Sequence, residues 1–257
     1  MAARAGAERA DIPATPEAAR VLFGDRLARA ERFVATLADT GIRHGLIGPR
    51  EAPRLWDRHV LNCAVVHSAI PVGSVRRRVV DVGSGAGLPG MTIAIARPDL
   101  DVHLVEPLRR RASWLTDTVA QIGLTNVVVH QARAEALWDE IETPWVMARA
   151  VTDILQLAEW TLPLLSRDGS LLALKGTKAR TELAEHDAAL RSLGVIDAGV
   201  NEYGADLLAE PTLVLTLRIA ARVDRSLFRA RPTSSAGSAR RRGDRPRRPR
   251  RDRSRLR

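Results

Sequence analysis

The part of this sequence best suited to bind a ligand is a glycine-rich segment in its first half. It reads Asp81-Val82-Gly83-Ser84-Gly85-Ala86-Gly87-Leu88-Pro89-Gly90 and includes the end of a short β-branched run at residues 79–82. A strand that leads through such a loop into a helix brings free backbone N–H groups together with the positive end of the helix dipole. The alternating glycines permit positive φ angles and let a ligand approach the backbone closely. We therefore expect a nucleotide-type ligand here.

A carboxylate follows this loop at the spacing typical of an adenosine site. Glu106 comes about twenty residues after the loop, directly behind a second apolar run at residues 102–105. A carboxylate at the end of that strand accepts hydrogen bonds from the two hydroxyl groups of a ribose. The loop and Glu106 together indicate an adenosine-containing cofactor, whereas either feature alone is a weak signal.

Strands and helices alternate in the part of the chain that contains this site. Apolar runs predict seven strands, at residues 79–82, 102–105, 127–129, 145–148, 170–174, 195–196 and 212–219. Helical periodicity predicts helices at residues 88–96, 109–122, 152–165 and 178–193. This alternation indicates an α/β fold with a mainly parallel, doubly wound sheet. The short connection between the last two strands has no helical pattern, which indicates an antiparallel hairpin at the sheet edge.

The chain divides into four parts. We expect a flexible leader at residues 1–14, a small N-terminal helical cap at 15–74, a cofactor-binding core at 75–221 and an Arg-rich tail at 222–257. The tail holds fifteen arginines and three aspartates, a net +12, so the other residues carry −2 of the total net charge of +10. A segment with so few apolar residues is expected to be disordered. It can neutralise phosphate groups without reading a base sequence.

The composition excludes several classes of protein. Cys63 is the only cysteine, which rules out an internal disulfide framework and a cysteine-built zinc site. The six histidines show no metal-ligand spacing, so no metal is expected. The chain has no apolar stretch typical of a signal peptide or a membrane span. We therefore predict a cytoplasmic protein, and a monomer as the default.

The glycine loop itself leaves two cofactors open. Gly85-x-Gly87-x-x-Gly90 fits the dinucleotide fingerprint, so an NAD-linked dehydrogenase is the alternative. Three features favour S-adenosylmethionine: the Gly83-x-Gly85-x-Gly87 triplet with Asp81 upstream, the helical cap before the loop, and the terminal hairpin. Asp81-x-Gly-x-Gly-x-Gly resembles motif I of class I S-adenosylmethionine-dependent methyltransferases, which have a Rossmann-like fold. Binding of NADH and not of S-adenosylhomocysteine would favour the alternative.

Further blocks resemble one particular family of these enzymes. They are Leu88-Pro89-Gly90 after the loop, Arg58-His59 upstream, Ala148-Arg149-Ala150 and Ala173-Leu174-Lys175-Gly176, in that order. Over about residues 20–220 the sequence resembles the RsmG family, also called glucose-inhibited division protein B. The resemblance implies an rRNA (guanine-N7-)-methyltransferase that modifies guanine 527 of the 16S rRNA in the small ribosomal subunit.

The resemblance also implies roles for individual residues. Those that would contact the cofactor are Gly83, Leu88, Glu106, Ala134, Glu135 and Arg149. Basic residues in the cap and after the predicted strands are the candidates for RNA binding, namely Arg58, His59, Arg110, Arg133 and Lys175. Arg149 and Lys175 also follow predicted strands, at the sheet edge where ligands of open α/β sheets bind.

No catalytic dyad is evident in the sequence. Guanine N7 has a free lone pair at neutral pH, so transfer of an activated methyl group needs no general base, and catalysis is mainly positioning. Arg149 and Lys175 are the candidates for that positioning. A protein that binds RNA on a relic cofactor fold is a further alternative, and the intact loop and Glu106 argue against it.

Overall fold

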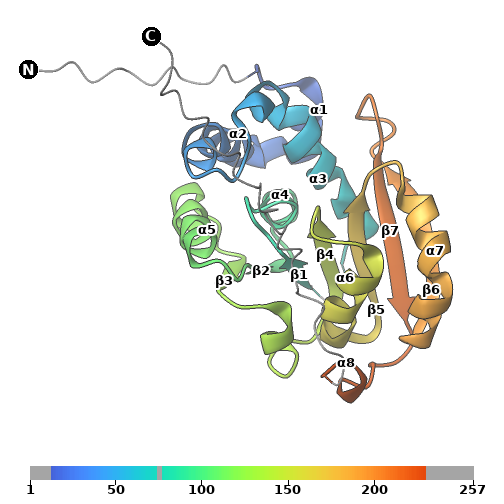
Figure 1. Cartoon of the computed structure of the whole chain (residues 1–257). Helices are drawn as coiled ribbons and strands as arrows, with labels where there is room; N and C mark the ends of the chain where they lie inside the picture. Colours follow the sequence, from blue (N-terminus) through green and yellow to red (C-terminus); the bar gives the residue numbers. More distant parts are fainter. Residues whose placement is uncertain (1–12, 74–76, 230–257) are drawn as a thin grey trace, which may run out of the picture.

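A computed structural model describes residues 13–73 and 77–229 of the chain. One mixed sheet forms its central layer, and helices cover both faces (Figure 1). The expectations for residues 1–12 and 230–257 lie outside the described residues. No helix of the described part is long and apolar enough to cross a membrane.

The sheet has seven strands in the order β3-β2-β1-β4-β5-β7-β6. Strands β1 to β5 are parallel, and β7 is antiparallel to both β5 and β6. This confirms the predicted fold with its terminal hairpin. The strand bounds are β1 Arg78–Val82, β2 Asp101–Val105, β3 Val127–His130, β4 Thr143–Arg149, β5 Leu165–Lys175, β6 Val195–Tyr203 and β7 Thr212–Ile219.

The longer helices of the core connect these strands, and the cap is made of shorter helical pieces. The core contains α4 Gly90–Ala96, α5 Arg109–Ile122, the 3-10 turn η6 Ala134–Leu137, α6 Ile154–Thr161, η7 Leu162–Leu164, α7 Ala179–Ser192 and α8 Ser226–Arg229. The cap contains α1 Glu17–Phe23, η1 Gly24–Arg26, α2 Leu27–Thr36, η2 Leu37–Gly41, η3 Pro49–Arg54, η4 Leu55–Leu61, α3 Asn62–Ala64 and η5 Val65–Ala69. The expected cap is helical, but its second half is a series of 3-10, π and α turns from Pro49 to Ala69. Pro53, which has no N–H to donate, lies within the first of them.

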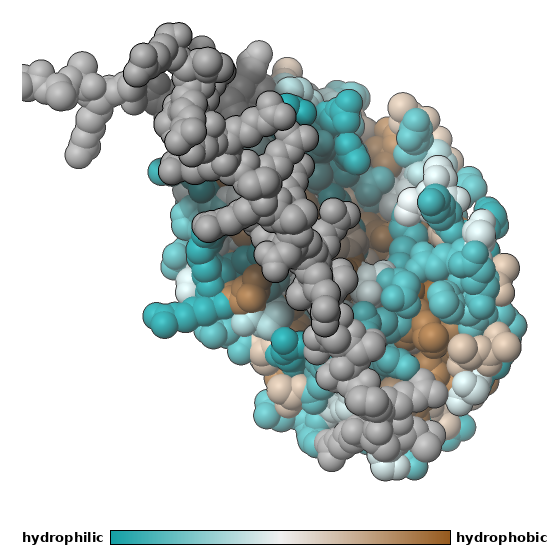
Figure 2. Space-filling view, viewed as in Figure 1, coloured by the Kyte–Doolittle hydropathy of each residue, from teal (hydrophilic) through white to brown (hydrophobic). Residues whose placement is uncertain are grey.

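The cap and one face of the sheet share a single hydrophobic core. Phe23 and Phe33 of the cap belong to the same buried cluster as Met91 of α4 and Leu104 of β2. The other face is buried under α6 and η6, where Val80, Val146 and Leu157 are among the buried residues. Successive strand residues point to opposite faces, so Val79 joins the first cluster and Val80 the second. The face seen in Figure 2 is mainly hydrophilic, with small apolar areas between polar side chains.

The residues directly after β7 pack on the core. Phe228 of α8 is buried, and its ring lies edge-on to Trp138 with 6.2 Å between the ring centroids. Arg225 donates to a carboxylate oxygen of Asp139 at 3.0 Å. The part of the chain that packs on the core therefore extends beyond residue 222, where the Arg-rich tail is predicted to begin. The charged composition does begin there, but the buried Phe228 follows it.

Candidate cofactor site

The glycine loop connects the carboxyl end of β1 to the start of α4. Its backbone is tied to β2, since Gly83 N and Ser84 N both donate to Val105 O, at 2.9 and 3.2 Å. The loop then turns back on itself through a bond from Gly87 N to Ser84 O at 2.7 Å. Gly83 and Gly87 have φ angles of +74° and +80°, which side chains with a Cβ rarely adopt.

Close neighbours also explain why these positions are glycine. A Cβ on Gly83 would lie 2.9 Å from Val151 Cγ2, and one on Gly87 would lie 2.6 Å from Met91 Sδ. The loop is thus packed against the protein on one side as well as suited to a ligand. A substitution at Gly83 would disturb this packing, so it does not isolate ligand binding.

Glu106 lies directly beside the loop, as the spacing predicts. Its side chain is almost fully buried, and Oε2 accepts a hydrogen bond from Gly85 N at 3.0 Å. Oε1 accepts from Leu108 N at 2.9 Å, and Arg111 Nη1 lies 3.9 Å from Oε2. A carboxylate oxygen can accept more than one hydrogen bond, so both oxygens keep capacity for ribose hydroxyl groups.

Asp81 is the buried acid of the site. Oδ2 accepts from Gly90 N at 3.0 Å, while Oδ1 is buried without a hydrogen-bond partner. Burial raises the pKa of Asp81 to about 7, against the lowering effect of the hydrogen bonds from Gly90 and Ser84 and of the charge on Arg149. An unpaired buried polar atom at the base of the loop is a place where a polar group of a ligand or a water molecule fits.

Arg149, at the end of β4, joins the core to the cap. Nη2 lies 2.6 Å from His59 Nδ1, and Nη1 donates to His59 O at 3.3 Å and to Cys63 Sγ at 2.9 Å. The next residue, Ala150, has a positive φ of 53°, an uncommon conformation for a residue with a Cβ. A constrained backbone and three side-chain bonds therefore fix the guanidinium group.

His59 is buried between two charged partners. An arginine can only donate, so the bond from Arg149 requires His59 Nδ1 to be an acceptor, and the ring proton then sits on Nε2. Nε2 donates to Glu51 Oε2 at 2.9 Å. Burial lowers the pKa of His59, opposed by the hydrogen bond with Glu51, and that same bond lowers the pKa of Glu51. His59 is thus a neutral link between an acid of the cap and Arg149.

Lys175, at the end of β5, is bonded within the protein. Nζ donates to Thr152 O and to Glu182 Oε1, both at 2.7 Å. Glu182 Oε1 also accepts from Ile154 N at 2.6 Å, so this carboxylate serves both the first turn of α6 and the lysine. In this arrangement Lys175 holds the segment after β4 in place.

The remaining candidate residues differ in how far their side chains are buried. Leu88 and Ala134 are buried, and Glu135 is half-buried in η6. Three candidates are exposed: Arg58, which lies 3.4 Å from Glu51 Oε1, Arg110, which donates to His44 O, and Arg133 before η6. Sequence reasoning missed Glu51 and Cys63 as partners in the Arg149 cluster, because no local pattern connects them to a strand end about 90 residues later. The described residues contain no group of three or more His, Cys, Asp or Glu side chains that could hold a metal ion.

Comparison with known proteins agrees with this geometry. A family model described as rRNA small subunit methyltransferase G, GidB, matches residues 26–210. The ribosomal RNA small subunit methyltransferase G of Pseudarthrobacter chlorophenolicus is 52% identical over 200 residues, which cover 78% of this chain and 91% of that protein. The protein of the same name from Mycolicibacterium smegmatis is 45% identical over 210 residues, covering 80% and 88%. The solved structure of the S-adenosylmethionine-dependent methyltransferase SibL covers 78% of this chain and 73% of its own, with a TM-score of 0.52 and 19% identity.

The sheet order and the loop beside Glu106 define a class I methyltransferase, the class that takes its methyl group from S-adenosylmethionine. Relatives with about 50% sequence identity over most of their length identify the family within this class. The chain belongs to the GidB family of small-subunit rRNA methyltransferases, which confirms the family resemblance.

Proposed function

We propose that this chain methylates N7 of guanine 527 in the 16S rRNA of the small ribosomal subunit, in the cytoplasm and as a monomer. Membership of the GidB family supports an rRNA substrate. The observation that carries the cofactor assignment is the Glu106 carboxylate, buried beside the glycine loop and bonded to Gly85 N. The choice of N7 rests on the family resemblance, and it agrees with a site that has no evident general base.

The residues of the site fit S-adenosylmethionine. Glu106 would accept the ribose hydroxyl groups, and the backbone from Gly83 to Leu88 would lie along the cofactor. Ala134 and Glu135 in η6 would flank the adenine. The unpaired Asp81 Oδ1 offers an acceptor below the loop. The cofactor supplies a methyl group already activated by its sulfonium.

The protein then has to bring the guanine into line with that methyl group. N7 attacks with its own lone pair, so no side chain has to remove a proton, and orientation accounts for the rate. Arg149 lies at the carboxyl edge of the sheet and is held by His59 and Cys63. Arg58, Arg110 and Arg133 are the exposed candidates for rRNA phosphates. His59 and Lys175 bond within the protein, so we assign them a positioning role.

A transfer assay with nucleotide mapping tests the proposal. The full chain is incubated with small ribosomal subunits from a strain that lacks the modification and with tritium-labelled S-adenosylmethionine. We expect label in the 16S rRNA, and backbone cleavage specific for 7-methylguanine at position 527. Label at another nucleotide would refute the position, and RNA binding without label would favour the alternative of an RNA-binding protein.

The Glu106→Gln variant tests the cofactor site in the same system. It keeps the shape of the side chain but loses the charge and one acceptor, and hydrogen bonds to charged groups contribute about 1.5–3 kcal/mol. We therefore expect about 10- to 100-fold weaker binding of S-adenosylhomocysteine by calorimetry. Glu185→Gln, on the exposed face of α7, is the matched control and should bind like the unmodified chain.

A further inference from the structure

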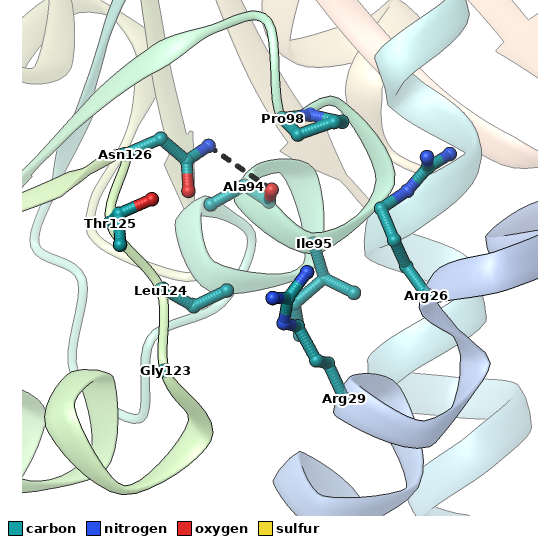
Figure 3. A pocket seen from close by; sticks show the side chains of 9 residues that line it. All are labelled: Arg26, Arg29, Ala94, Ile95, Pro98, Gly123, Leu124, Thr125 and Asn126. Atoms are coloured by element: carbon teal, nitrogen blue, oxygen red, sulfur yellow. Dashed lines mark hydrogen bonds between the residues drawn. The ribbon is translucent and has the colours of Figure 1, made fainter.

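A hollow lies at the end of the sheet opposite to the cofactor loop. Its walls come from the cap and from the segments before β2 and β3, and the hollow itself has a volume of about 50 Å³. Arg26 and Arg29 form one side, while Thr125 and Asn126 lie across from them (Figure 3). The strand β2 has five residues, so about 17 Å of strand separates this hollow from Glu106.

The charged side chains that line this hollow are all positive. Its lining residues are Arg26, Arg29, Ala94, Ile95, Pro98, Gly123, Leu124, Thr125 and Asn126, with no acid among them. Within the described part of the chain neither arginine has an ion pair. The nearby Arg97 shows the contrast, since its Nη2 lies 2.7 Å from Asp99 Oδ2 and its Nη1 donates to Ile70 O at 2.8 Å.

One N–H group of the half-buried Arg26 side chain has neither water nor an acceptor beside it. Its Nε is buried and has no hydrogen-bond partner. The positive charge of Arg26 also contributes, after burial and Arg97, to the lowered pKa of His67. An acceptor placed at this guanidinium group would hydrogen-bond to it and offset its positive charge.

Arg26 and Arg29 lie where η1 passes directly into α2. Arg26 is the N-cap residue of this ten-residue helix and makes no side-chain cap bond, and its first turn contains no acid. Arg29 follows within that first turn. Cations near the N-terminal end of a helix are unfavourable, whereas an anion there is favourable. An anion bound between the two arginines would offset this placement and their mutual repulsion.

We propose that this hollow binds a phosphate group of the rRNA backbone, as a second docking point at a distance from the methylated base. Guanidinium groups bind phosphate through charge-assisted hydrogen bonds, and the Thr125 hydroxyl on the opposite wall can add a donor. Arg29 and Thr125 are exposed, so a phosphate that is part of a long polymer can reach them. The source in rRNA rests on the proposed function.

The structure also suggests the competing explanation that the experiment must exclude. The helices α4 and α5 end near this hollow, at Ala96 and Ile122, and cations favour the negative ends of helices. If Arg26 and Arg29 only serve these helix ends, their removal lowers stability and leaves RNA binding unchanged. If they bind phosphate, their removal lowers the number of phosphates that the protein neutralises.

The double variant Arg26→Gln, Arg29→Gln in the full chain separates these explanations. Affinity for small-subunit rRNA is measured over a series of KCl concentrations, for which each lost phosphate contact reduces the slope of log K against log salt by about one. We expect a slope smaller by one to two and affinity about tenfold weaker at low salt. Arg32→Gln is the control, because Arg32 lies on α2 outside the hollow and its Nε donates to Ala28 O. An unchanged slope, or an equal change in the control, would overturn the proposal.

A direct measurement distinguishes the source of the phosphate. In ¹H–¹⁵N spectra of arginine Nε–H groups, the Arg26 signal is assigned by its loss in Arg26→Gln. A short rRNA fragment should shift this signal at lower concentration than inorganic phosphate does. A shift with inorganic phosphate alone would refute the rRNA source. Transfer assays of the unmodified chain report on the proposed function separately, because the slope and the Nε–H shift do not require methylation.

Discussion

Asp81 is a residue whose position and protonation are set by the site around it. Its carboxyl group lies fully buried between the loop and α4, with Oδ2 bonded to Gly90 N and Oδ1 unpaired. A group with a raised pKa in the folded state holds its proton there at pH values at which the unfolded chain has lost it. Its contribution to stability is therefore present at low pH and lost as pH rises through the folded pKa.

Replacing Asp81 by Asn should reduce the loss of stability that occurs as the pH rises from acidic values to neutrality. The pKa of Asp81 is raised from 3.8 to about 7, so the unmodified chain loses this contribution between about pH 4 and pH 7. Asn is neutral at every pH. The free energy of unfolding of the Asn variant, relative to that of the unmodified chain, should therefore rise by on the order of 2 kcal/mol between pH 5 and pH 8. Urea denaturation at both pH values measures this difference. Equal pH dependence of the two proteins would contradict a raised pKa.

At the scale of elements, the cap and the core meet through His59 and Arg149. His59 lies on η4 of the cap and Arg149 ends β4, and Glu51 of η3 completes the contact. Arg149 is also a candidate cofactor contact, so this contact between the cap and the core connects the position of the cap to the cofactor site.

Substitution of His59 by Phe tests this link. Phe fills similar space but accepts nothing from Arg149 and donates nothing to Glu51, so unfolding should need about 1–3 kcal/mol less free energy. If His59 positions Arg149, the affinity for S-adenosylhomocysteine should fall as well, at a temperature where the variant is fully folded. Calorimetry measures that affinity. The exposed His44→Phe is the control, and a His59 variant with unchanged affinity would reduce the role of His59 to stability.

Two glycines of the core should differ in their tolerance of alanine. A Cβ on Gly90, the first residue of α4, would collide with Leu104 Cδ2 and lie 2.7 Å from Asp81 Oδ2, whereas a Cβ on Gly176 would have no neighbour within 4 Å. We expect Gly90→Ala to lower the free energy of unfolding by about 1–3 kcal/mol. Gly176→Ala should change it by less than about 0.5 kcal/mol. Thermal unfolding of both variants checks this, and similar melting temperatures would show that α4 can move away from β1.

Local sequence determines some of these elements and distant partners determine the rest. The β1 strand, the glycine loop and Glu106 are predictable, because a β-branched run and glycine spacing act within a few residues. The β6 strand is predicted only at residues 195–196 and in fact runs to Tyr203, since pairing with β7 extends a polar segment. The contact of His59 with Arg149 joins positions 90 residues apart, and no local pattern reports it.

At the scale of the whole molecule, the net charge is distributed unevenly along the chain. Residues 230–257 hold twelve arginines and two aspartates, a net +10, which equals the net charge of the full chain. The rest of the molecule is therefore neutral overall, and any attraction to RNA that depends on net charge comes from this segment. Its expected disorder lies outside the described residues, but its charge acts through Coulomb forces in any conformation.

Removal of residues 230–257 should therefore weaken rRNA binding without affecting the cofactor site. The cut belongs after Arg229, because removal from residue 222 would also delete Phe228, which packs on Trp138, and Arg225, which binds Asp139. We expect a loss of rRNA affinity that is largest at low KCl and shrinks as salt screens the charges. Affinity for S-adenosylhomocysteine should stay the same.

A second truncation after residue 221 should lower the melting temperature in addition, which separates the packing of α8 on the core from the electrostatic role of the arginines. Unchanged rRNA affinity across the salt series after the shorter truncation would show that the arginine-rich segment contributes nothing to RNA binding.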